Sequence, residues 1–262
     1  HLDQDPSYII GGSAKNLGGR NAHAGSGPAF VIEADEYDRM FLGLNPDIIV
    51  ITYLEHDHPD CFPTPQVYYQ AFVEFLHRLR SGGTLLLASN SPEARRLAEN
   101  APQDAFVQTY GTDPAADYVA ENLAANDRGG FDYDACWRSA EGKKIHLAHI
   151  SLQAPGEHNA RNSLAALAVV HRLAATQRLA SAGSIAQVLA RAAQGLAEFS
   201  GTGRRFDILG EVDGITVVDD YAHNPAKIQA TLSAARSRYP GQRIWAVWQP
   251  HTYSRTIAFL TD

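Results

Sequence analysis

Short apolar runs alternate with amphipathic segments along the first half of the chain. Phe30–Ile32, Ile48–Thr52, Thr84–Ala88 and Phe106–Tyr110 are rich in apolar and β-branched residues, as in strands that are covered on both faces. Pro65–Arg80 carries apolar residues at helical spacing, and a second helix is expected behind the Ser-Pro-Glu that begins at residue 91. This β-α-β-α-β alternation predicts a doubly wound, mostly parallel α/β sheet flanked by helices.

Three longer segments with strand-like patterning follow. Tyr118–Leu123, Phe131–Arg138 and Ile145–Leu152 are separated by glycine-containing turns, which predicts an antiparallel sub-sheet at the edge of the parallel one. Pro155–Gly156 ends this pattern, and a helix with a small-residue packing face is expected after it. The next helix is expected to begin at a capping box opened by Ser184.

The pattern restarts after a glycine-bearing connection at Phe199–Phe206, which is the candidate domain boundary. Ile215–Val218 predicts a strand, Asn224–Arg238 a helix and Ile244–Trp248 a second strand. This βαβ unit has too few strands to be a finished sheet. We therefore expect a central domain over residues 1–200, followed by the first part of a Rossmann-like domain over residues 201–262.

Acids and histidines follow the first two apolar runs. Ligands of parallel sheets bind beyond the carboxyl ends of the strands, so these side chains are expected to share one rim. A divalent cation such as Mg²⁺, Mn²⁺ or zinc is the simplest way to hold so much negative charge there. The alternative is that His56 and His58 are solvated and that the acids cap helix N-termini. The rim residues are Glu33, Asp35, Glu36, Asp38, Glu55, His56, Asp57, His58 and Asp60.

The composition is ordinary for a globular protein and narrows the partner classes. The 262 residues are 45% hydrophobic and 19% charged, and a net charge of −7 leaves no basic footprint for nucleic acid or a membrane surface. Cys61 and Cys136 make no disulfide framework, so a reducing cytosol is the expected compartment. Because the chain begins at His1 and Met40 is its only methionine, we expect it to be a piece of a longer protein.

Several other polar residues have both a plain and a functional interpretation. Arg204–Arg205 is either a solvated turn or a clamp for phosphate or carboxylate. Asp219–Asp220 holds a ribose hydroxyl or a metal, or it caps the following helix. His158–Asn159 and Asn162 either cap a helix or recognise a base. The glycine-rich residues 1–28 do not match the phosphate-binding pattern G-x-x-x-x-G-K-[ST], and we interpret them as a surface loop.

Six motifs occur in order: E-A-D-E-x-D at Glu33–Asp38, L-E-x-D-H at Leu54–His58, G-x-H-N-x-x-N at Gly156–Asn162, R-R-F at Arg204–Phe206, D-D-Y-A-H-x-P at Asp219–Pro225 and Q-P-H-T-Y-S-R-T at Gln249–Thr256. Together they resemble the Mur ligases of peptidoglycan synthesis over nearly the whole chain. The last two are most similar to the branch that adds L-alanine to UDP-N-acetylmuramate. The first motif and the region Asp57–Phe62 also resemble the recycling branch that attaches a ready-made tripeptide.

The resemblance implies an ATP-dependent, ADP-forming amide ligase of the bacterial cytoplasm that uses Mg²⁺. ATP would phosphorylate the muramate carboxylate, and the amine of L-alanine would attack the acyl phosphate. The residues implied by motif match are Glu33 and His58 for Mg²⁺, Asn159 and Asn162 for adenine, Arg205 for the phosphates, Asp220 for the ribose, and Tyr221, His223, His251 and Arg255 facing the reacting groups.

The chain also departs from the family pattern. We expect the chain to lack the family's phosphate-binding loop and uridine-binding domain, which lie upstream in that family, and the second half of the C-terminal domain. Tyr53 stands where many relatives carry asparagine. No lysine lies between Lys15 and Lys143, so the carbamoylated lysine of some branches cannot come from that region, in agreement with the alanine-adding branch. We expect the 262-residue chain alone to have no ligase activity.

Two other function classes remain open from the residues alone. A metallohydrolase would use Glu33, His56 and His58 around zinc, and tight stoichiometric zinc would favour it. A non-catalytic nucleotide-binding module would keep a site at Asn159 and Asp220 without turnover. The oligomeric state and the choice between L-alanine and tripeptide are not fixed by the sequence.

Overall fold

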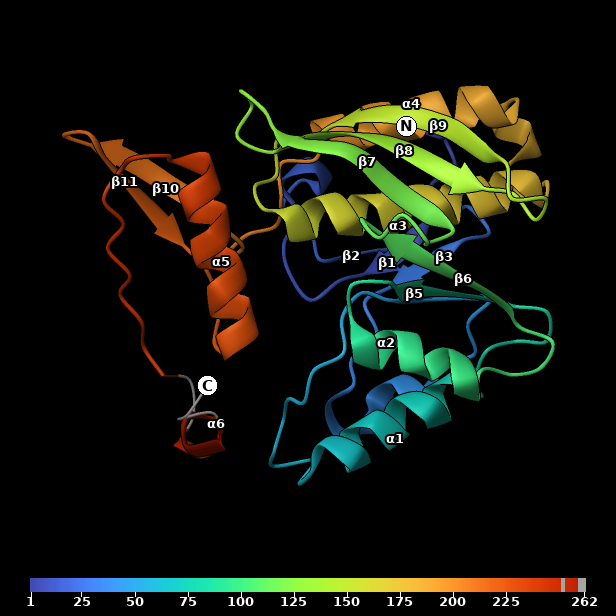
Figure 1. Ribbon diagram of the computed structural model, residues 1–262, viewed down its shortest axis with the longest axis horizontal. Helices are drawn as coiled ribbons and strands as arrows, with labels where there is room; N and C mark the ends of the chain where they lie inside the picture. The colour runs from blue at the N-terminus through green and yellow to red at the C-terminus, as the bar shows by residue number, and fades with distance from the viewer. Residues whose placement is uncertain (251–252, 259–262) are drawn as a thin grey trace.

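The core of the protein is a six-stranded sheet in the order β4-β5-β6-β7-β8-β9 (Figure 1). The computed structural model describes residues 1–250 and 253–258. Neighbouring strands are parallel from β4 to β7 and antiparallel from β7 to β9, which confirms the predicted mostly parallel sheet with an antiparallel edge. The strands are β4 (Ile48–Ile51), β5 (Thr84–Ala88), β6 (Phe106–Gly111), β7 (Tyr118–Ala125), β8 (Phe131–Arg138) and β9 (Lys144–Ser151).

Helices cover this sheet on both faces. Leu85, Leu86 and Leu87 of β5 are each 0% exposed, although successive side chains of a strand point to opposite faces. Leu85 and Leu87 pack with α1 and α2, and Leu86 packs with α3 and α4. Among the described residues, no helix is both long and apolar enough to cross a bilayer. The helices are α1 (Pro65–Leu76), α2 (Pro92–Arg96), α3 (Glu157–Ala175) and α4 (Ile185–Glu198), with 3-10 turns η1 (Lys15–Leu17), η2 (Tyr37–Gly43), η3 (Leu97–Asn100) and η4 (Ala180–Ala182).

The helix starts follow the sequence signals closely. Ser91 caps α2, and Ser184 caps α4 within a complete capping box. Helix α1, however, ends at Leu76 rather than at the predicted Arg80. The N–H of Arg78 already bonds to the carbonyl three residues earlier, so the chain tightens into a turn before the two glycines at 82 and 83.

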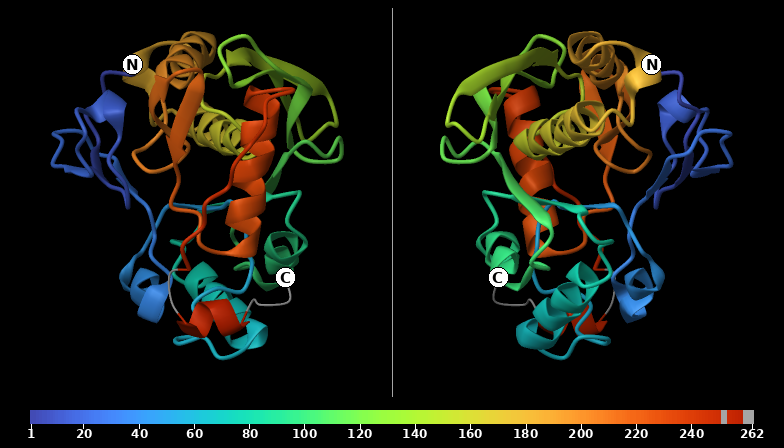
Figure 2. Two further views of the ribbon diagram at one scale, coloured as in Figure 1. Left: turned by 90° about the vertical axis from the view of Figure 1, so that its left-hand side faces the viewer. Right: turned by 90° about the vertical axis from the view of Figure 1, so that its right-hand side faces the viewer.

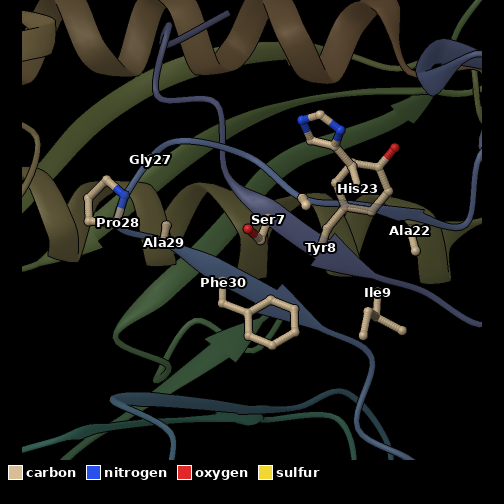
Figure 3. Close-up of a pocket in the computed structure, with 10 residues that line it drawn as sticks. Ser7, Tyr8, Ile9, Ala22, His23, Gly27, Pro28, Ala29 and Phe30 are labelled. Carbon is tan, nitrogen blue, oxygen red and sulfur yellow. The ribbon is translucent and has the colours of Figure 1, made fainter.

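A separate three-stranded sheet contains the first apolar run. Strand β3 (Phe30–Ile32) pairs in parallel with β1 (Ser7–Ile9), which in turn pairs with β2 (Ala22–His23). The prediction that β3 is buried in the same sheet as β4 is therefore wrong. Phe30 remains 59% exposed and points to the same side of the small sheet as Ile9, beside a hollow of about 630 Å³ (Figure 3).

The C-terminal part is a hairpin followed by a helix. Strand β10 (Asp207–Val212), which the sequence pattern did not predict, pairs antiparallel with β11 (Ile215–Asp219), and α5 (Pro225–Arg238) follows. The predicted strand at Ile244–Trp248 is not present, so the predicted βαβ unit is wrong. No strand within the described residues pairs with this segment, and Val247 there is 98% exposed. Helix α6 spans Tyr253–Ala258.

Helix α5 packs against the beginning of α3 (Figure 2). Gly156, directly before α3, has φ +92°, and a Cβ placed there would lie 2.6 Å from the ring of His158 and 3.1 Å from the Cβ of Ala234. Ala234 of α5 is 1% exposed. Glycine is therefore needed at this position both for the backbone conformation and for the close approach of the two helices.

Candidate functional site

The two acidic segments meet although their strands belong to different sheets. Oε1 of Glu36 lies 3.4 Å from Nε2 of His58. The Tyr37 hydroxyl donates to Oδ2 of Asp60 at 3.0 Å, and the Tyr68 hydroxyl donates to Glu36 at 3.4 Å. His58 has φ +55°, an uncommon conformation for a residue with a side chain. The segments are thus joined by side chains and turns rather than by strand pairing.

Glu33 is hydrogen-bonded to the N-terminal loop. Its Oε2 accepts a hydrogen bond from the N–H of Gly11 at 2.7 Å, and the carboxylate paired with His58 is that of Glu36. Within the described part of the chain, no group of three acid, histidine or cysteine side chains has a metal-ligand arrangement. A zinc centre built from Glu33, His56 and His58 therefore has no support in the geometry.

The rim is strongly negative and partly desolvated. Burial, followed by the negative charges of Glu36 and Asp57, raises the pKa of the Tyr68 hydroxyl well above its usual range. Hydrogen bonding to Cys61 and to Asp60 raises the pKa of Tyr37 to about 12. The interpretation of the rim histidines as simply solvated is also wrong.

The contacts of His56 show why the rim histidines are not simply solvated. It is half-buried, and its Nε2 lies 2.7 Å from the carbonyl oxygen of Phe62. His58 is half-buried too and faces Glu36. Both rings are thus held by the protein and contribute to a structured rim.

The connection between the two halves of the chain is held by the N-terminal loop. Lys15 Nζ lies 2.6 Å from Oδ1 of Asp207, and the Asn16 side chain bonds to both Glu198 and Ser200. An isolated β-bridge joins Ala14 to Thr202. A cavity of about 140 Å³ lies along this connection and is lined by residues that include Lys15, Arg128, Arg205, Asp207 and Arg238.

The residues expected to bind the nucleotide gather at the start of α3. Burial, aided by Arg161 and Arg205, lowers the pKa of His158, whereas the charge of Asp220 acts in the opposite direction. Charges of the C-terminal part, those of Asp220 and Arg205, thus act on His158 of the central part. Asn159, the next residue, is half-buried and donates from Nδ2 to the carbonyl of Pro155 at 2.7 Å.

Asp220 stabilises the connection between the two halves of the chain by hydrogen bonds and does not cap a helix. Its Oδ2 accepts from the N–H of Phe206 at 2.8 Å, and its Oδ1 accepts from the N–H of Ala222 at 2.7 Å. The cap of α5 is instead Asn224, whose Oδ1 accepts from the N–H of Lys227. The helix-capping interpretation of the Asp219–Asp220 pair is therefore wrong for Asp220.

Asn162 lies in the second turn of α3 and is exposed, and Gly156 precedes the helix without a side-chain cap. The helix-capping interpretation is thus wrong for Asn159 and Asn162 as well. No side chain caps the N–H groups at the start of α3, although the Asn159 amide donates to the carbonyl of Pro155 just before it.

The guanidinium groups of Arg204 and Arg205 lie near the ring of Tyr221. The guanidinium carbons of Arg204 and Arg205 lie 4.8 Å and 5.8 Å from the ring centroid of Tyr221. Nε of Arg204 also lies 3.5 Å from Oδ2 of Asp219. Tyr221 in turn packs edge-on against His223, with ring centroids 4.9 Å apart. Both arginines are exposed and lie in a turn, so the solvated-turn interpretation fits the structure, and a clamp for phosphate or carboxylate stays a prediction.

Asp57 links the two halves of the chain, which sequence reasoning missed. It is 5% exposed, and its Oδ2 accepts from Nδ2 of Asn224 at 3.1 Å and from Nζ of Lys227 at 3.3 Å. Nζ of Lys227 also lies 3.4 Å from Nε2 of His223. The only available signal for Lys227 was its position four residues after His223, on the first turn of a helix.

Two of the expected site residues cannot be placed. His251 lies outside the described residues, as does the side chain of Arg255, whose backbone forms part of α6.

The chain matches two family models. Residues 21–170 match the Mur ligase middle domain, and residues 204–260 match the Mur ligase, glutamate ligase domain. It is 39% identical over 267 residues to the UDP-N-acetylmuramate–L-alanine ligase of Roseiflexus castenholzii, covering 98% of this chain and 53% of that protein. It is 38% identical over 264 residues to the enzyme of that name from Chloroflexus aggregans, covering 95% and 52%.

Solved structures agree in fold. The UDP-N-acetylmuramate-alanine ligase of Thermotoga maritima superposes with a TM-score of 0.73 at 26% identity, covering 100% of this chain and 54% of that one. A murein peptide ligase of Psychrobacter arcticus gives a TM-score of 0.65 at 22% identity, covering 95% and 52%. The chain spans about half the length of the curated relatives it matches. The matched domains and the identity to these relatives show that the chain belongs to the Mur ligase family.

Proposed function

We propose that this chain works as part of a ligase that joins L-alanine to UDP-N-acetylmuramate in the bacterial cytoplasm while ATP is converted to ADP. The relatives that bear this activity in their names support the choice of substrates. The observation that carries the proposal is a contact between the two halves of the chain. Asp57, from the L-E-x-D-H motif of the first half, contacts Asn224 and Lys227 of the second half. In this proposal residues 1–200 form the central ATP-binding domain and residues 201–262 begin the C-terminal domain.

The nucleotide would lie between the start of α3 and the connection to the hairpin. Asn159 and Asn162 are assigned to adenine, Asp220 to the ribose and Arg205 to the phosphates. The electrostatic action of Asp220 and Arg205 on His158, which is next to Asn159, supports this arrangement. The N-terminus of α3 adds a favourable electrostatic field for an anionic ligand.

Mg²⁺ would be held at the acidic rim by Glu33 and His58. Carboxylate oxygens with one imidazole nitrogen are a reasonable donor set for Mg²⁺ or Mn²⁺, so the residues present fit the ion. Glu36, which already lies 3.4 Å from His58, is the carboxylate that would share the site. The ion would offset negative charge on the phosphates during transfer.

The reaction needs two displacement steps. A carboxylate oxygen of the muramate attacks the γ-phosphorus of ATP, and the bond from that phosphorus to the ADP oxygen breaks. The amine of L-alanine then attacks the acyl carbon, inorganic phosphate leaves, and the amine loses a proton. Tyr221, His223, His251 and Arg255 are assigned to the surface that faces these groups. The stack of Arg204 and Arg205 against Tyr221 supports a fixed orientation of that surface.

The test is ADP release by the protein made from its complete coding region. With UDP-N-acetylmuramate present, we expect turnover with L-alanine to exceed turnover with the tripeptide L-alanyl-γ-D-glutamyl-meso-diaminopimelate. Higher turnover with the tripeptide would overturn the choice of amino substrate. ADP release that does not depend on UDP-N-acetylmuramate would overturn the ligase proposal itself.

A further inference from the structure

Lys227 touches both halves of the proposed site, yet none of the steps above uses it. Its Nζ lies 3.3 Å from Oδ2 of Asp57 in the central part and 3.4 Å from Nε2 of His223 in the C-terminal part. The side chain is 40% exposed, whereas the side chain of Asp57 is 7% exposed. A buried carboxylate is costly unless it is paired and hydrogen-bonded, so Asp57 requires the donors that the C-terminal part brings.

Those donors come from one helix start. Asn224 caps α5 through Oδ1 and donates to Asp57 through Nδ2, so one side-chain amide both caps the helix and holds the helix start against Asp57. The first turn of α5 also presents its positive end toward the same carboxylate. Lys227 adds a full positive charge to this arrangement. Together these contacts dock the start of α5 on Asp57.

The hydrogen bonds around His223 define its tautomer. Nδ1 lies 2.8 Å from the carbonyl oxygen of Tyr221, which can only accept, so Nδ1 carries the proton. The ammonium of Lys227 can only donate, so Nε2 faces it with a lone pair. These two contacts match the Nδ1–H tautomer of the ring.

We propose that Lys227 is a positioning residue: its ammonium bridges Asp57 and His223, and it thereby fixes both the orientation of the His223 ring and the place of α5 on the central domain. The inference rests on the proposed function in one respect, because His223 is assigned there to the reacting groups. Lys227 then determines how the surface that contains His223 is oriented toward the acidic rim of the central part.

The first experiment reads the ring directly and needs no turnover. Long-range ¹H–¹⁵N correlation spectra of the 262-residue chain, with the signal assigned by comparison with His223→Gln, should show the Nδ1–H tautomer. Lys227→Met should let the ring turn away from the Tyr221 carbonyl and so give a mixture that contains the Nε2–H form, whereas Lys227→Arg, which keeps a cationic donor, should retain the Nδ1–H form. Lys144→Met is the matched control, because Lys144 makes a comparable ion pair with Glu121 on the strand sub-sheet.

The outcomes separate this inference from the proposed function. A pure Nδ1–H signal in folded Lys227→Met would overturn the positioning role. If that variant fails to fold, Lys227→Leu, which also removes the donor, takes its place, and an unchanged tautomer in it would also overturn the role. In the complete protein, Lys227→Met should lower kcat about tenfold with little change in the KM for ATP, and Lys227→Arg should recover most of it. A tautomer change without any ligase activity in the complete wild-type protein would refute the proposed function and leave the assignment of Lys227 standing.

Discussion

Asp57 and Asn224 share a hydrogen bond of 3.1 Å although 167 positions separate them in the sequence. Both side chains are buried, at 5% and 7% exposure. Asp57 belongs to the segment that follows β4, and Asn224 begins α5, so this bond ties the acidic rim to the C-terminal part. Its position explains why residues from distant motifs face one another.

Two substitutions of Asn224 should distinguish the stability contributed by the cap of α5 from that contributed by the hydrogen bond between Asn224 and Asp57. Asn224→Ala removes both and should lower the free energy of unfolding by about 2 kcal/mol. Asn224→Ser keeps a capping oxygen but loses the donor to Asp57, so about 1 kcal/mol should be lost. Urea unfolding of the chain measures both. Ser184→Ala, which removes a cap away from that hydrogen bond, is the control. Equal stability of Asn224→Ala and the wild type would contradict this account.

The central strand should be sensitive to loss of side-chain volume. Leu86→Ala leaves a cavity between β5 and helices α3 and α4 and should cost about 2–5 kcal/mol in the free energy of unfolding. Leu209→Ala removes the same atoms from a residue that is 64% exposed and should change stability by less than about 0.5 kcal/mol. Thermal or chemical unfolding compares the two. A similar effect at both positions would mean that the packing of β5 is not as described.

The stability of the central part should fall below pH 6.5. His171 is 7% exposed, its Nδ1 lies 2.9 Å from the Tyr118 hydroxyl, and burial, followed by the charge of Arg172, lowers its pKa from 6.5. The unfolded chain therefore binds the proton more readily than the folded one. The stabilisation is complete above pH 6.5 and is lost as the pH falls toward the folded-state pKa, by at most about 1.4 kcal/mol per pH unit for one proton.

The variant His171→Gln tests this assignment. Below pH 6.5, the unfolding free energy of this variant should change less with pH than that of the wild type. Some pH dependence should remain, because the buried His158 also has a lowered pKa. His77→Gln, at an exposed position, should leave the dependence unchanged. An identical pH profile for His171→Gln and the wild type would refute the role of His171.

Loss of the Asn159 amide should weaken ATP binding in the complete protein. Asn159→Ala should raise the KM for ATP about tenfold, the effect of one lost hydrogen bond of about 1.4 kcal/mol, without a comparable change in the KM for L-alanine. Steady-state ADP release provides both constants. Asn122→Ala is the control, because Asn122 bonds to Asp134 on the strand sub-sheet. An unchanged KM for ATP would remove Asn159 from the nucleotide site.

Most secondary-structure elements were predictable because their signals are local. The caps at Ser91, Ser184 and Asn224 and the strands of the antiparallel edge follow from neighbouring residues. The failures occurred where pairing partners decide the outcome. Phe30–Ile32 has an apolar pattern suited to a buried strand, yet it pairs with β1 in a separate sheet. Ile244–Trp248 has a strand-like pattern without a paired neighbour among the described residues.

The sequence by itself determined the family, the α/β class and the motif residues, because these depend on residue types and on short spacings. Only the tertiary structure decided which side chains meet: Glu36 beside His58, and Asp57 beside Asn224 and Lys227. The physical reason is that such contacts join segments far apart in the chain. Their geometry depends on sheet pairing, on turns with positive φ and on the docking of α5, none of which local periodicity encodes.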